Sequence, residues 1–204
     1  LRSAGIDVEP WQLAVAWRLR GDAEQVKAGR YEFEGPITLE GLLDALIEGQ
    51  PEKERTIALI EGWTFRQVRE SLAKAPELVA TIAELSDSDV MRRLDAQESH
   101  PEGLFAPDTY AYRIGSTDLE LLARAYRLQR QRLEAAWEQR AAGLTLASPR
   151  ELLILASIVE KESGRQEDRP MVASVFHNRL RIGMLLQSDP TTIYGLGEQF
   201  DGNL

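Results

Sequence analysis

The sequence has 204 residues, of which 43% are hydrophobic and 28% are charged, and its formal net charge is −9. These proportions are typical of a globular protein of one or two domains and exclude a disordered chain. The negative charge argues against nucleic acid as the main partner, because phosphate binding requires a basic surface. Cysteine is absent and only two histidines occur, so thiolate chemistry, a histidine-rich metal site and a Ser–His–Asp triad are not expected. We therefore expect no metal and no cofactor.

The first part of the chain, residues 1–52, is predicted to have a helix–strand–helix character. Its predicted elements are a helix, a turn with a short strand and a second helix, at residues 9–20, 27–33 and 38–49. In the first of these helices, Trp11, Val15 and Leu19 have the spacing of an apolar face. The proline-containing segment that begins at Pro51 is a plausible boundary between domains.

The second part, residues 53–204, is predicted to be mainly helical. A strand is expected at residues 55–60, and the capping box T-F-R-Q that starts at Thr64 predicts the beginning of a helix. The other predicted helices cover residues 76–85, 88–96, 117–142, 148–164, 171–182 and 188–195. Residues 100–112 are rich in proline, glycine and aromatic side chains. This segment is either a wall of a sugar-binding cleft or a tight turn packed on the core.

The most informative stretch is S-P-R-E-L-L-I-L-A-S-I-V-E-K-E-S-G, residues 148–164. Ser148 is a typical N-cap, Gly164 a typical stop, and the residues between them leave almost no polar face, which predicts a buried helix. A rotation of about 100° per residue places Glu162 within the apolar arc and Glu160 near its edge. Desolvation and the helix dipole would then favour a protonated Glu162, as a general acid for glycosidic cleavage requires. The commoner explanation of such a residue is a structural ion pair with an arginine.

Several motifs along the chain resemble one protein family. The runs I-V-E-K-E-S-G and M-V-A-S-V-F-H-N-R-L-R-I-G-M-L-L-Q-S-D-P-T-T-I-Y-G are similar to those of the MltG-type, or YceG-like, endolytic murein transglycosylases. The earlier motifs K-A-G-R-Y-E-F, E-G-W-T and E-G-L-F-A-P-D-T-Y resemble the same family in the same order. The resemblance implies an α+β fold, mainly α. It implies a small LysM-like α/β subdomain in residues 1–52, followed in residues 53–204 by a helix-rich, lysozyme-like transglycosylase catalytic domain.

The resemblance also implies which residues form the site. In the broader lysozyme-like fold the catalytic glutamate is followed by serine, and Glu162-Ser163 matches that pattern. Leu186-Gln187 resembles the Met–Gln pair of that fold, which would place Gln187 near the substrate. The further candidates for substrate binding are Asn178, Tyr194, Asp189, Ser163 and Glu160. Asp189 could instead be a helix cap, and Glu160 a structural or orienting partner.

The implied protein is a single-pass inner-membrane enzyme with its catalytic part in the periplasm, and it cleaves peptidoglycan glycan strands without water. Its N-terminal anchor, and the Tyr-Asn-Thr-Tyr segment that the family carries further on, are expected outside residues 1–204. Peptidoglycan synthases of the elongation or division machinery are candidate partners. Two alternatives are a hydrolytic muramidase in which Glu160 or Asp189 assists, and a non-catalytic wall-binding or divisome scaffold. Products with 1,6-anhydro ends would favour the transglycosylase over the muramidase.

Overall fold

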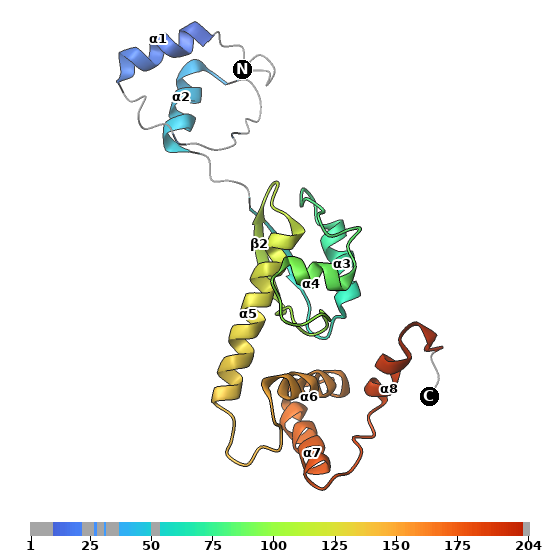
Figure 1. Ribbon diagram of the computed structural model, residues 1–204. Helices are drawn as coiled ribbons and strands as arrows, with labels where there is room; N and C mark the ends of the chain where they lie inside the picture. Colours follow the sequence, from blue (N-terminus) through green and yellow to red (C-terminus); the bar gives the residue numbers. More distant parts are fainter. Residues whose placement is uncertain (1–9, 22–26, 28–30, 32–36, 50–53, 202–204) are drawn as a thin grey trace. The chain divides into compact units, whose positions relative to one another are not determined.

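The structure, a computed structural model, describes residues 10–21, 27, 31, 37–49 and 54–201. The chain divides into two compact units, Leu1–Glu54 and Arg55–Leu204. The described residues are mainly helical with a two-stranded sheet (Figure 1), which confirms the predicted α+β, mainly α, class. The LysM-like and catalytic assignments of residues 1–52 and 53–204 stay predictions.

The first unit contains two described helices, α1 (Pro10–Arg20) and α2 (Leu39–Glu48). Thr38 caps α2 through its side chain, as predicted, and Gly49 ends the helix with a φ of 75°. The small core of this unit centres on the buried Leu42 of α2, against which four partly buried residues pack, namely Leu13, Ile37, Leu39 and Leu46. The strand predicted at residues 27–33 lies largely outside the described residues.

The predicted apolar face of α1 is wrong. Trp11 and Leu19 are 64% and 83% exposed, and Val15 is exposed as well. The helix instead contributes Leu13, on another side, to the core around Leu42. The spacing of apolar residues in the sequence identified the helix itself, but it did not identify the side of the helix that meets a neighbouring element.

The second unit begins with a core built on the two strands. Its elements are β1 (Glu54–Leu59), α3 (Phe65–Lys74), α4 (Asp87–Arg93), β2 (Asp108–Arg113) and α5 (Asp118–Glu138). Strand β1 pairs with β2. Alternate residues of both strands, Ile57 and Leu59 in β1 and Tyr110 and Tyr112 in β2, are buried in this core. Leu121 of α5 joins them without any exposed surface.

Two predictions for this region are wrong. Residues 76–85 form turns, and not a helix, because their backbone bonds to other segments: Val79 forms a parallel bridge with Thr117, and the buried Asp118 carboxylate accepts from the Thr81 amide at 2.9 Å. Strand β2 lies in a segment that was predicted to be a loop or tight turn. The alternation of buried Tyr110 and Tyr112 along β2 is the period-two signal that would have identified it.

The remaining helices are α6 (Pro149–Glu162), α7 (Arg169–Arg181) and α8 (Asp189–Leu196), with short 3-10 turns η3 (Gln166–Asp168) and η4 (Gly197–Gln199). Helix α6 packs on α7 around a second core (Figure 1). The buried residues of this core are Leu146, Leu155, Ile158, Val159 and Phe176. Trp137, near the end of α5, packs against the second core, so α5 connects the two cores of this unit.

Helix α6 is buried on one side only. Leu155, Ile158 and Val159 face the second core, whereas Ile154 is 49% exposed. The helix ends at Glu162, with Ser163 as C-cap at a φ of −103°. The predictions of a helix buried all round and of a left-handed stop at Gly164 are therefore wrong. No helix among the described residues combines the length and apolar character that crossing a membrane requires.

Candidate active site

The last turn of α6 carries two carboxylates in different surroundings. Glu160 is partly buried, and each of its carboxylate oxygens lies 2.8 Å from the same guanidinium nitrogen, Nη2, of Arg169 in α7. Glu162, about half a turn further round the helix, has no ion-pair partner among the described residues. The arginine pair that could have explained Glu162 therefore belongs to Glu160.

The Glu162 side chain is held by a serine. Its Oε1 accepts a hydrogen bond from Ser188 Oγ at 2.6 Å, and Ser188 is only 4% exposed. Glu162 itself is exposed, so the expectation of a poorly solvated carboxyl is wrong. The physical reason is the one-sided packing of α6, which buries Ile158 and Val159 but leaves the last turn open to water.

Ser188 is placed by the segment that joins α7 to α8. Arg179 of α7 donates a hydrogen bond from Nη1 to the carbonyl of Leu186, and the Met184 amide donates to the Arg179 carbonyl at 2.8 Å. Gln187 then adopts a left-handed backbone with a φ of 50°, which is uncommon for a residue with a side chain. Arg179 therefore stabilises this segment through a backbone carbonyl.

The other predicted site residues are distributed around this point. Gln187 and Asp189 flank Ser188 and are exposed, with Asp189 as the first residue of α8. Ser163 is buried, and its Oγ donates to the Val159 carbonyl at 2.7 Å, which is a structural role. Asn178 is exposed on α7, and no described contact connects it with Glu162.

Tyr194 of α8 is 57% exposed and lies near Glu102. Partial burial, and then the charge of Glu102, raise the pKa of the Tyr194 phenol. The loop that contains Glu102 thus comes close to α8. Both belong to motifs that the sequence analysis singled out, but the Glu102–Tyr194 proximity was not predicted.

Two glycine-containing loops lie against α6. A Cβ atom at Gly62 would lie 3.7 Å from Glu160 Cγ and from Lys161 Nζ, and one at Gly103 would lie 3.7 Å from Leu153 Cδ2. Both glycines have left-handed φ angles, 75° and 76°, which side chains rarely adopt. The motifs E-G-W-T and E-G-L-F therefore place their backbones beside the same helix that carries Glu162.

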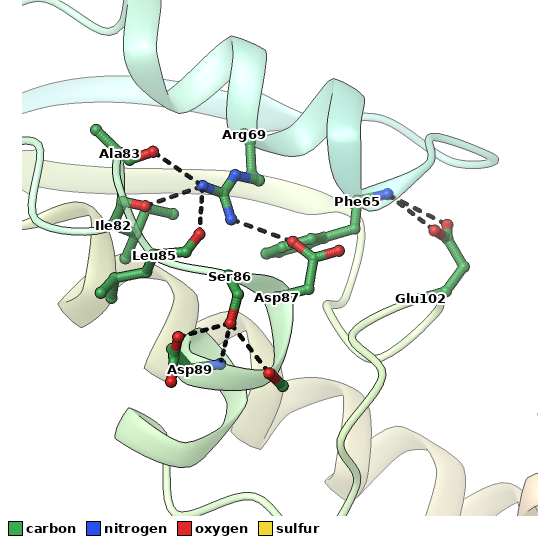
Figure 2. Close-up of polar contacts among 10 residues, drawn as sticks. Phe65, Arg69, Ile82, Ala83, Leu85, Ser86, Asp87, Asp89 and Glu102 are labelled. Atoms are coloured by element: carbon green, nitrogen blue, oxygen red, sulfur yellow. Dashed lines mark hydrogen bonds and ion pairs between the residues drawn. The ribbon is translucent and has the colours of Figure 1, made fainter. Parts of the chain in front are cut away.

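The two loops are tied together by Glu102. Both oxygens of its carboxylate accept from the Phe65 amide, the first of α3, at 3.2 Å (Figure 2). Thr64 caps the same helix end in the predicted capping box with Gln67. A carboxylate is favourable at the positive end of a helix dipole. Glu102 therefore fixes the second loop to the start of α3.

Arg69 in α3 holds the next segment in place. Its Nη2 donates to the carbonyls of Ile82, Ala83 and Leu85 at 2.9, 3.2 and 2.9 Å, and its Nη1 donates to Asp87 Oδ1 at 3.1 Å (Figure 2). Residues 82–86, which lead into α4, have no helix or strand, and Arg69 holds them in place. Sequence reasoning missed this arginine because its partners follow from tertiary packing alone.

Metal binding finds no support in the described residues, where no group of three or more histidine or carboxylate side chains could hold an ion. Each of the two histidines has a local role instead. His100 Nδ1 accepts from the Glu102 amide at 3.3 Å, and His177 Nε2 accepts from the Thr145 amide at 3.2 Å.

A solved structure shares the fold of this chain. A 2.6 Å crystal structure of a YceG-like protein from Listeria monocytogenes matches 94% of this chain and 68% of its own, with a TM-score of 0.55 and 22% identity. The model of the YceG-like family matches residues 1–204 of the sequence. The chain belongs to the YceG-like family, as the motifs predicted.

Two curated relatives from bacteria have names that state an activity. A protein from Bacillus subtilis is 28% identical over 195 residues, which cover 88% of this chain and 54% of the relative. A protein from Streptococcus pneumoniae is 27% identical over 201 residues, which cover 85% of this chain and 36% of the relative. Both are named endolytic murein transglycosylase. The chain spans about half or less of the length of these relatives.

Proposed function

We propose that the chain carries the catalytic centre of an endolytic murein transglycosylase, with Glu162 as its single acid and base. The observation that carries this proposal is the contrast between the two glutamates of α6. Glu160 is neutralised by Arg169. Glu162 is exposed, and among the described residues its one hydrogen-bond partner is the neutral hydroxyl of Ser188, so no described cation is paired with its carboxylate.

The proposed substrate is the β-1,4 bond between N-acetylmuramic acid and N-acetylglucosamine in a glycan strand. Protonated Glu162 donates its proton to the glycosidic oxygen, and the bond from that oxygen to C1 of the muramic residue breaks. The C6 hydroxyl of the same residue attacks C1 and gives its proton to the Glu162 carboxylate. The products are a free 4-hydroxyl on N-acetylglucosamine and a 1,6-anhydro-muramic end, and the acid is regenerated.

A single carboxylate is enough for this reaction. The nucleophile is part of the sugar, so no water has to be positioned, and the attack is intramolecular. Hydrolytic glycosidases generally need two carboxylates that flank the bond. Glu160 is held in its ion pair, which supports the non-hydrolytic reaction over the muramidase.

The first prediction concerns Glu162→Gln. In the full-length protein we expect this variant to lose strand cleavage by a factor of at least about 10², because a carboxamide cannot exchange the proton that general acid and base catalysis transfers. Mass spectrometry of purified glycan strands after digestion measures both the extent of cleavage and the chemistry of the ends. The parent protein is expected to give 1,6-anhydro ends.

Glu160→Gln is the matched control, since it removes the other carboxylate of the same helix turn. We expect it to keep the same products at a comparable rate. Reducing muramic ends from the parent protein would show a hydrolase. Cleavage unchanged in Glu162→Gln would contradict the enzymatic proposal and would leave a wall-binding scaffold as the function.

The remaining parts of the proposal concern the whole protein. We propose a LysM-like, membrane-proximal role for residues 1–52, an N-terminal inner-membrane anchor, a periplasmic catalytic part, and peptidoglycan synthases as partners. The motif resemblance supports this arrangement. A pull-down assay with purified peptidoglycan tests the LysM-like role. Retention of a segment of residues 1–54 would support that role, and no retention would contradict it.

A further inference from the structure

Ser188 has an unusual position for a serine at the start of a helix. It is the N-cap of α8, yet its side chain makes no capping hydrogen bond to that helix. A serine at this position usually accepts from an amide of the first turn. Here its Oγ instead lies 2.6 Å from Glu162 Oε1, across 26 residues of sequence. The hydroxyl thus donates a hydrogen bond to a carboxylate on another helix.

The segment around Ser188 is built to hold that hydroxyl in place. Arg179 binds the Leu186 carbonyl, Gln187 takes its left-handed conformation, and Thr191 Oγ1 donates to the Ser188 carbonyl at 2.7 Å. Ser188 is also 4% exposed, whereas its neighbours Gln187 and Asp189 are exposed. A left-handed residue held by its surroundings is typical of functional sites.

We infer that Ser188 is a positioning residue for Glu162, an inference that rests on the function proposed above. Its hydrogen bond fixes the orientation of the carboxyl group and occupies Oε1. No described residue forms a hydrogen bond to Oε2, so Oε2 is the oxygen that exchanges the proton with the sugar. Ser188 therefore determines which oxygen of the Glu162 carboxyl group faces the sugar.

Other charged groups lie on the elements around this end of α6. Glu160 is paired with Arg169, and Arg179 is bound to a carbonyl. The further charged or titratable groups on the neighbouring elements are Lys161 on α6, Asp189 and Tyr194 on α8, and Glu61 and Glu102 in the two loops. None of them is bonded to Glu162, so a change confined to Ser188 reports on the Ser188–Glu162 bond.

The second prediction is that Ser188→Ala in the full-length protein lowers kcat on purified glycan strands on the order of tenfold, with KM changed by less than about threefold. Without the hydrogen bond the carboxyl group is less often in the productive orientation, so the loss falls on kcat and not on KM. Ser188→Thr keeps a hydroxyl and is expected to restore kcat to near the value of the parent protein.

Ser174→Ala is the control, because that serine on α7 donates only to the Met171 carbonyl at 2.7 Å. Its kinetics are expected to match those of the parent protein. If Ser188→Ala does not fold, Ser188→Cys keeps the size of the side chain with a weaker donor and must also lower kcat. A loss of kcat that Ser188→Thr does not restore, or that comes with an equal change in KM, would mean a merely structural role and would overturn the inference. If Glu162→Gln is inactive but Ser188→Ala has the kinetics of the parent protein, the inference about Ser188 is overturned. The proposed function would still stand.

Discussion

At the last turn of α6, one arginine decides which glutamate is structural. Arg169 approaches Glu160 from α7, and the side chains of the pair are 39% and 28% exposed. Its Nε is buried without a partner among the described residues. An ion pair so close to water contributes little to stability. Its main consequence is that Glu160 and Glu162, two residues apart, have different chemistry.

The third prediction follows from that exposure. Arg169→Met keeps the apolar part of the side chain and removes the charge, so we expect the free energy of unfolding to fall by only about 0.5–1 kcal/mol. Urea denaturation of the parent protein and the variant measures the difference. A loss of more than about 3 kcal/mol would show that the pair behaves as a buried one.

At the scale of elements, α3 organises the first core of the second unit. The N-terminus of α3 is capped by the Thr64–Gln67 capping box and by the Glu102 carboxylate, which accepts from the first amide of the helix. Arg69 lies in the middle of the helix. Arg69 also lies 5.9 Å from the centre of the Phe65 ring, which stacks on Phe105 at 5.1 Å. One helix therefore orders both the loop that contains Glu102 and the segment that leads into α4 (Figure 2).

The fourth prediction concerns Arg69→Met. The substitution leaves the partly buried carbonyls of Ile82 and Leu85, and the exposed carbonyl of Ala83, without their donor, so we expect a destabilisation of about 2–3 kcal/mol. Urea denaturation gives the magnitude, and hydrogen exchange of the α4 amides should show faster local opening. Lys74→Met, at the exposed end of the same helix, is the control and should change stability by less than about 0.5 kcal/mol. Equal effects of the two substitutions would contradict the role of the carbonyl bonds.

At the scale of the whole molecule, stability rests on separate cores, and the first core of the second unit contains most of the buried aromatic groups. The phenols of Tyr110, Tyr112 and Tyr126 are buried and donate to the Ala106 carbonyl, the Pro76 carbonyl and Glu98 Oε2, at 2.7, 2.9 and 2.8 Å. Burial is the largest cause that raises the pKa of each phenol above its ordinary value of 10.0. The folded protein therefore holds these phenolic protons more tightly than the unfolded chain.

The fifth prediction is a loss of stability in alkali. Because the folded-state pKa of each phenol is raised, its contribution is fully present below pH 10.0 and is lost as the pH rises through the folded-state pKa. Urea midpoints measured across this range, together with the ultraviolet absorbance of phenolate, test the effect. Tyr112→Phe should weaken the pH dependence. Tyrosines that ionise fully near pH 10 without unfolding would contradict the burial argument.

Local signals in the sequence were sufficient to predict most of the helices and to identify the family. The caps at Thr38, Thr64 and Ser148 depend on hydrogen bonds within four residues, so the sequence alone determined where those helices begin. The motifs from E-G-W-T to Q-S-D-P-T-T determined family membership and indicated Glu162. Residues 76–85 and β2 were mistaken because their structure depends on distant partners such as Asp118 and on the pairing of β1 with β2.

Only the tertiary structure decided the character of the site. Arg169 reaches Glu160 across nine residues of sequence, and Ser188 reaches Glu162 across 26. Periodicity placed Glu162 in an apolar arc, but the packing of α7 on one side of α6 left its last turn exposed. The physical reason is that a local pattern specifies the direction of a side chain on its own helix. The solvent, charge and hydrogen-bond donor that the side chain meets are supplied by other elements.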